Sequence, residues 1–161
     1  MNAEELMIGD WVEFASKYGY GKGQIVAIEP REGSAEPTTF TIWKKDKEGN
    51  TKFFVGVSRN GVRPIPLTEE ILLKNGFERK SERLRHIEFE LTINPNTEDE
   101  HWLVVKLHPA NENCNIIWAH IYYVPDSRID LNTIETKIVN CGVHHLQHIL
   151  RLCSIEKEIE L

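Results

Sequence analysis

The sequence has few cysteines, and their placement is unlike that of a disulfide framework or a metal site. Cys114, Cys141 and Cys153 are odd in number, lie far apart and form no C-x-x-C pair. Disulfide-stabilised domains and zinc ribbons carry even numbers or closely spaced pairs of cysteines. We therefore expect three reduced thiols and no cysteine-bound metal.

Long apolar runs and a basic leader are also missing. A transmembrane helix needs about 20 consecutive apolar residues, and the apolar stretches of this chain are far shorter. The first five residues, Met-Asn-Ala-Glu-Glu, are acidic where a secretory signal would be basic. These absences predict a cytoplasmic protein that is not embedded in a membrane.

The chain has no excess of positive charge. It carries 19 Lys and Arg against 25 Asp and Glu, a net charge of −6. Residues 1–66 hold nine of each sign, so residues 67–161 carry the whole negative excess. Acidic surfaces repel phosphate backbones. Any contact with nucleic acid would therefore come from the N-terminal part, and the balance favours a protein partner.

The motifs of the common enzyme classes are absent as well. There is no G-x-S-x-G, and the glycine-rich residues 19–23 lack the spacing and the following helix of a phosphate-binding loop. Residues 94–100 are rich in side-chain oxygens, but Asp99 stands where a calcium loop needs glycine. These absences predict no cofactor and favour a protein that is not an enzyme.

What the chain does contain is a series of short apolar segments separated by turn residues. Residues 15–23 hold three glycines and no apolar periodicity, which predicts a loop, and Asn60-Gly61 predicts a two-residue hairpin turn. Five short strands within residues 1–66 are typical of a small SH3-like barrel or meander. We expect the strands at residues 11–14, 24–28, 38–44, 51–57 and 62–65.

Residues 68–75 carry the clearest helix signals. Thr68 is a good N-cap, two glutamates follow it at the positive end of the helix dipole, and Gly76 is placed to end the helix in a left-handed conformation. Phe77 can then fold back onto Leu72. We interpret residues 67–83 as a helical connector that ends in a charged loop, 78–83.

The C-terminal part, residues 84–161, is predicted to be an antiparallel sheet packed by one helix. Residues 86–93 alternate between apolar and polar side chains without error, and residues 141–153 place an apolar stripe on one helix face. The expected fold class is therefore α+β and mainly β. The remaining predicted strands are 102–107, 115–124 and, at the C-terminus, a short one at 156–161.

Histidines on the predicted C-terminal helix form the first candidate site. His144 and His148 are spaced i, i+4, as in helical zinc motifs, but His145 replaces the glutamate that would act as general base. They lie opposite the apolar stripe, toward solvent or a facing loop, and no third ligand has a recognisable spacing. We favour a polar helix face and no metal, and a metal-dependent hydrolase is the alternative.

A second candidate lies on the strand predicted at 86–93. His86, Glu88 and Glu90 share its polar face and could form an acid–base set. Any half-exposed strand gives the same alternation, so we favour a solvated face.

The glycine-rich segment is the best candidate for a binding surface. Tyr18, Tyr20 and Lys22 combine aromatic rings with a cation, and Trp43 on the predicted third strand points outward and could extend the platform. Such a surface suits a peptide or stacked bases. The alternative, which we favour for the two tyrosines, is that they close the open end of the barrel.

Three stretches of the sequence stand out together: residues 6–12, residues 64–77 with the sequence PIPLTEEILLKNGF, and the helix residues 143–148 with 150–153. They resemble a family of small uncharacterised proteins from gut anaerobic bacteria and their phages or mobile elements. Ser154 departs from the pattern, which has a glycine after this helix. The resemblance implies a context in phages or mobile elements and no assigned reaction.

Taken together, these observations predict a non-enzymatic accessory or binding protein with a protein partner. A nucleic-acid-binding module that acts through the N-terminal barrel is one alternative, and the metal-dependent hydrolase is the other. The oligomeric state and the identity of the partner stay open.

Overall fold

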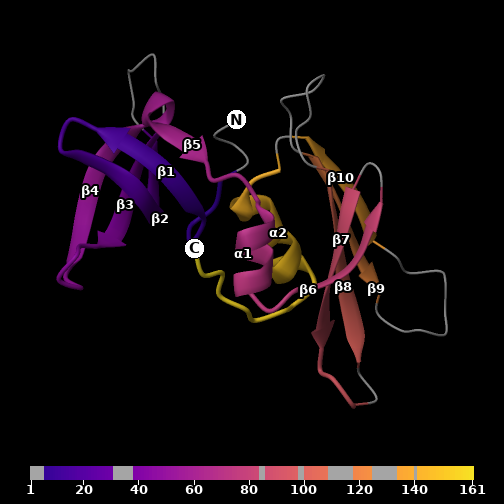
Figure 1. Ribbon diagram of the computed structural model, residues 1–161. Helices are drawn as coiled ribbons and strands as arrows, with labels where there is room; N and C mark the ends of the chain where they lie inside the picture. Colours follow the sequence, from indigo (N-terminus) through magenta and orange to yellow (C-terminus); the bar gives the residue numbers. More distant parts are fainter. Residues whose placement is uncertain are drawn as a thin grey trace. The chain divides into compact units, whose positions relative to one another are not determined.

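The computed structural model describes residues 6–30, 38–83, 86–97, 100–108, 118–124, 134–139 and 141–161. The fold is mainly β, with two antiparallel sheets and two α-helices among these residues (Figure 1). The chain divides into two compact units. They are Met1–Ile65 with Gly142–His148, and Pro66–Cys141 with Ile149–Leu161.

Five strands form the sheet of the N-terminal unit in the order β4-β3-β2-β1-β5. They are β1 (Trp11–Ser16), β2 (Gly19–Pro30), β3 (Thr38–Lys45), β4 (Thr51–Ser58) and β5 (Val62–Pro64). The sheet curls over its own core, because the rings of Phe14 in β1 and Phe54 in β4 lie 4.6 Å apart. Strand pairing ends at β4 and β5 within the described residues, so this is an open sheet and the predicted SH3-like barrel is not confirmed.

The loop predicted at residues 15–23 is wrong. Most of this segment is strand, and β1 and β2 form a hairpin that turns at Lys17 and Tyr18. The glycines serve packing inside the curled sheet: a Cβ on Gly23 would lie 2.6 Å from the carbonyl oxygen of Trp43, and one on Gly19 would lie 2.8 Å from the Phe54 ring. Glycine in a strand can mark such close approach as well as a loop.

The hairpin predicted at Asn60-Gly61 is also wrong. Residues Arg59–Gly61 form a short 3-10 turn, and β5 then pairs with β1 instead of returning along β4. The buried core of the unit consists of inward residues from all five strands and Leu6. Its members are Leu6, Val12, Phe14, Ile25, Phe40, Ile42, Phe54, Val57 and Val62.

The C-terminal unit contains a five-stranded antiparallel meander in the order β10-β9-β8-β7-β6. Its strands are β6 (Glu78–Arg83), β7 (His86–Ile93), β8 (His101–His108), β9 (Trp118–Val124) and β10 (Ile134–Val139). β6 corrects the predicted charged loop at 78–83, since a strand at the edge of a sheet tolerates charge. Residues 115–117 of the predicted strand at 115–124 lie outside the described residues, and β10 was not predicted.

Helix α1 (Glu69–Lys74) confirms the local signals read from the sequence. The Thr68 Oγ1 accepts a hydrogen bond from the Ile71 N–H at 3.3 Å. Gly76 has φ +77°, and the Phe77 N–H donates to the Leu72 carbonyl at 3.1 Å, as the left-handed ending requires. Both side chains of that ending, Leu72 and Phe77, are buried.

The strand predicted at 156–161 is absent, and the side chains of Lys74 in α1 and of Asn75, its C-cap, hold this segment instead. The Asn75 carboxamide donates to the Glu160 carbonyl at 2.8 Å and accepts from the Glu160 N–H at 2.9 Å. The Lys74 Nζ donates to the Leu161 carbonyl at 2.6 Å. The Asn75 carboxamide therefore satisfies the N–H and the carbonyl of one residue, as a neighbouring strand would.

Helix α2 spans Val143–Leu152, inside the predicted range of 141–153. Val143, Leu146, Ile149 and Leu150, all from the predicted stripe, are buried. In the part of the chain that the structure describes, no helix is long and apolar enough to cross a membrane.

Replacing Ser154 by glycine should raise the free energy of unfolding by about 0.5–1 kcal/mol. Ser154 has φ +56°, and the Ile155 N–H donates to the Leu150 carbonyl at 2.8 Å, so it occupies the left-handed position that ends α2. Chemical denaturation of the unchanged protein and of Ser154→Gly measures this change in the free energy of unfolding, and Ser154→Ala is the control. Equal stability of the two variants would contradict a strained serine.

Candidate functional site

The polar face of α2 packs against the turn that precedes β1. His144 is fully buried, and Gln147 is buried as well. Of the two environments expected for this face, solvent or a facing loop, the structure has the facing loop: Met7–Asp10 turns with Gly9 at φ +91°, and the Asp10 N–H donates to the Met7 carbonyl at 3.2 Å. The turn and the helix residues up to His148 belong to the N-terminal unit.

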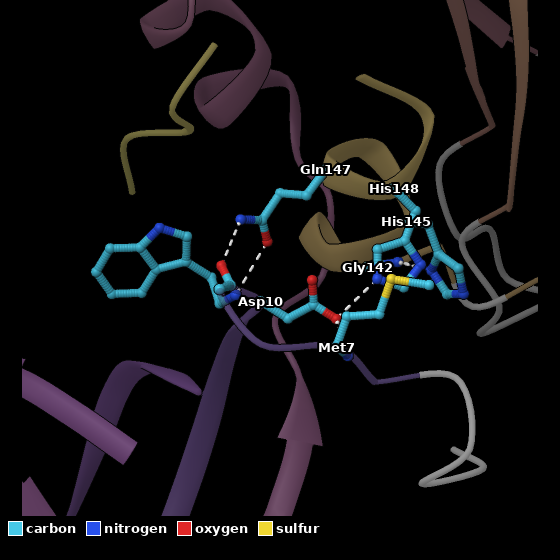
Figure 2. Close-up of polar contacts among 8 residues, drawn as sticks. Met7, Asp10, Gly142, His145, Gln147 and His148 are labelled. Atoms are coloured by element: carbon cyan, nitrogen blue, oxygen red, sulfur yellow. Dashed lines mark hydrogen bonds and ion pairs between the residues drawn. The ribbon is translucent and has the colours of Figure 1, made fainter. Parts of the chain in front are cut away.

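Asp10 is the centre of this contact, and its carboxylate is completely buried (Figure 2). One oxygen, Oδ2, accepts from the Met7 N–H at 2.8 Å and lies 2.8 Å from the His148 Nε2. A buried carboxylate needs hydrogen-bond donors to offset its lost hydration. Asp10 therefore fixes the turn and joins it to the helix at the same atom.

Gln147 makes the second join between helix and turn. Its Oε1 accepts from the Trp11 N–H at 2.9 Å, and its Nε2 donates to the Gly9 carbonyl at 3.0 Å (Figure 2). The side-chain amide thus satisfies backbone groups at the start of β1, much as a neighbouring strand would. Sequence reasoning missed both Asp10 and Gln147, since their partners lie more than a hundred residues away along the chain.

His144 and His145 occupy the first turn of α2 in different ways. The His145 Nδ1 accepts from the Gly142 N–H at 3.0 Å, so this side chain caps the helix start. The His144 ring lies 3.9 Å from the His145 ring, and both of its nitrogens are buried without a hydrogen-bond partner among the described residues. Burial first, and then the neighbouring His145, lowers the pKa of His144 to about 4. At neutral pH this imidazole is therefore uncharged.

His144 and His148, the pair of the alternative metal-site interpretation, have other surroundings in the structure. The rings of His144 and His148 lie 5.8 Å apart at 79°, and His148 already contacts Asp10. Across the described ranges, no group of three or more His, Cys, Asp or Glu side chains could hold a metal ion. What the arrangement does is position the helix on the turn.

The set on β7 has other partners. Glu88 pairs with Lys106 at 3.8 Å, and Glu90 pairs with Lys80 at 3.2 Å. His86 lies beside His108 on the next strand, with ring centroids 5.2 Å apart. Two carboxylates engaged by lysines are a feature of a half-exposed strand face.

The tyrosines of the predicted binding surface are open to solvent. Tyr18 is 70% exposed and Tyr20 81% exposed, values too large for side chains that close the end of a core. At that end of the core, the Phe54 ring lies next to Gly19 and the Lys44 side chain lies next to Gly21. Lys22 is exposed as well, two residues from Tyr20 on β2.

Trp43 belongs to a row of side chains that crosses the outer face of the N-terminal sheet. The register places Trp11 opposite Gln24, Gln24 opposite Trp43, and Trp43 opposite Phe53. The two indoles lie 6.5 Å apart, and the Trp43 Nε1 donates to the Gln24 Oε1 at 3.2 Å. We call these four residues the aromatic row. Phe53 ends it and is 63% exposed.

Sequence reasoning found Trp43 in this row but missed Trp11 and Phe53. The alternation within each strand places both on the outer face, but only the strand register brings them into line with Trp43. Lys22 and Lys45 lie two residues along from Gln24 and Trp43 on the same face, so cations border the row.

Comparison of the chain with protein-family models, with curated proteins and with solved structures gives no match. The resemblance to the small proteins of gut bacteria and their phages stays a prediction. The functional interpretation therefore depends on the chemistry of the sites themselves.

Proposed function

We propose that this protein is a cytoplasmic, non-enzymatic binding protein that recognises a protein partner through the outer face of its N-terminal sheet. The observation that carries the proposal is the aromatic row, which continues to the exposed edge of the sheet at Phe53. Val55 lies two residues further along β4 and is 62% exposed. Adjacent exposed apolar side chains of this size favour a binding surface.

The chemistry of the face indicates what the partner presents. Aromatic rings are enriched at the centre of protein interfaces, where they bury large areas with few rotatable bonds. Lys45, which lies opposite the uncharged Thr51, borders the row and would attract carboxylates at its rim. A partner segment with apolar side chains flanked by acidic residues fits this face best.

The few and widely spaced cysteines of the sequence support the proposed location, because thiols stay reduced in the cytoplasm. Among the described residues Cys153 has a free thiol, and burial raises the pKa of Cys141 to about 12. An origin in phages or mobile elements depends on the sequence resemblance alone.

The test is partner capture by the immobilised chain from a lysate of the source organism, compared across matched variants. Phe53→Ser should remove the partner, whereas Leu152→Ser, which replaces a leucine that is 79% exposed on α2, should retain it. Each side chain is exposed, so both variants should fold. A partner that survives Phe53→Ser and Trp43→Ala would count against this face.

Nucleic acid is the second candidate, because Tyr20 and Lys22 could stack a base and hold a phosphate. Glu13 faces Lys22 across the β1–β2 ladder, which weakens any attraction for phosphate. We expect oligo(dT) and oligo(U) to bind negligibly at 50 mM salt in fluorescence anisotropy, at concentrations on the order of 10 µM. Salt-sensitive binding that Tyr20→Ala weakens would favour this candidate over a protein partner.

A further inference from the structure

The two edges of the N-terminal sheet are protected to different degrees. β5, at one edge, has only three residues and contains Pro64, which cannot donate to a further strand. β4, at the other edge, has eight residues and pairs only with β3 within the described chain. An exposed edge is a template for another strand unless charge, proline or irregularity blocks it.

The edge of the other unit shows what protection looks like in this protein. Five of the six residues of β6 are charged, namely Glu78, Arg79, Lys80, Glu82 and Arg83. β4 has one cation, Lys52, and then the uncharged run Phe53–Ser58. Its protection is a bulge, because the register with β3 shifts between Phe54 and Val57, where Gly56 has φ +70°.

The residues of β4 that precede the bulge remain available for pairing with another strand. Phe53 and Val55 point to the same outer face and are 63% and 62% exposed, while Phe54 between them points into the core. This short segment can meet an identical segment in antiparallel orientation. A two-fold axis through Phe54 would then place Phe53 of each copy opposite Val55 of the other.

We propose that two copies of this chain associate through their β4 edges, in antiparallel register centred on Phe54. The register is self-complementary in shape, because each copy contributes one aromatic and one β-branched side chain to a cross-strand pair. It is also acceptable in charge, because Lys52 falls opposite Gly56 and not opposite a second lysine. The neutral run and this charge pattern select a second copy over an acidic or basic partner at the edge.

Such an interface is small, so the dimer should be weak. Pairing over Phe53–Val55, before the bulge, involves three residues of each strand, well below a standard interface. We expect a dissociation constant on the order of 100 µM. The association uses the backbone edge of β4 and shares Phe53 and Val55 with the proposed partner surface, so a bound partner should compete with the dimer.

Sedimentation equilibrium of the full chain from 5 to 500 µM tests the association. The weight-average mass should rise from one chain toward two. Val55→Lys should keep the chain monomeric at 500 µM, while Tyr20→Lys, at an exposed position on β2, should behave as the unchanged protein. A monomer throughout, or a dimer that Val55→Lys leaves intact, would overturn the proposal.

A charge exchange tests the register. Phe53→Lys and Val55→Glu should each weaken self-association at least tenfold, because each change removes both apolar pairs. Mixing the two variants should restore association, since the new lysine of one copy lies opposite the new glutamate of the other. A mixture no more associated than the separate variants would contradict pairing centred on Phe54.

Discussion

Replacing Asp10 by alanine should lower the free energy of unfolding by about 3–5 kcal/mol, one of the two largest changes that we expect. The carboxylate is completely buried and bonds the Met7 N–H and the His148 Nε2, both at 2.8 Å. Its removal leaves the Met7 N–H and the His148 ring without this hydrogen-bond partner and opens the turn before β1. Urea denaturation followed by tryptophan fluorescence, with Trp11 next to the turn, measures the loss.

Two further variants make the Asp10 result specific. Asp10→Asn keeps an acceptor for the Met7 N–H but loses the charge, so it should cost less than Asp10→Ala. Glu13→Ala removes an exposed carboxylate from β1 and should change stability by less than about 0.5 kcal/mol. If Asp10→Ala were as mild as Glu13→Ala, the buried carboxylate would not hold the turn on the helix.

Lowering the pH from 7.5 to 5 should cost about 2 kcal/mol of stability through His144 alone. Burial holds the pKa of this imidazole at about 4, against an ordinary value of 6.5 in the unfolded chain. Between these values the unfolded state binds more protons than the folded state. The contribution of His144 to stability is therefore greatest above pH 6.5. It falls as the pH drops toward 4 and changes no further at lower pH.

The groups around His144 set the size of this effect. His145 and His148 disfavour a further positive charge, whereas Asp10 favours it, and burial outweighs all three. His144→Phe removes the titrating group and keeps a ring in the same place. Denaturation at pH 7.5 and pH 5 should show a difference for the unchanged protein that is about 2 kcal/mol larger than for this variant. Parallel pH dependence of the two proteins would contradict a buried neutral His144.

Local signals in the sequence predicted the parts of the fold that depend on neighbouring residues. Thr68 and Gly76 define α1 because an N-cap and a left-handed ending are short-range features. The alternation in residues 86–93 predicted β7 for the same reason. The pairing of β5 with β1 could not be predicted from Asn60-Gly61, because the choice between β4 and β1 as its neighbour depends on tertiary packing.

The candidate site was harder to predict, because its contacts join distant parts of the chain. Asp10 and His148 are separated by 138 residues, and no local sequence pattern near either residue predicts their contact. The aromatic row depends on the register of four strands, so the sequence pattern led to Trp43 but not to its neighbours Trp11 and Phe53. Glycines read as loop residues proved to be contact points inside a curled sheet.

The claim that the outer face of the N-terminal sheet binds the partner is tested most directly by hydrogen exchange of the chain with and without the captured partner. We predict slower exchange in the strands that carry the aromatic row, β1 to β4, and unchanged exchange in α2 and in β7 and β8. Protection confined to β7 and β8, with β1 to β4 exchanging as in the free chain, would contradict the proposed binding surface.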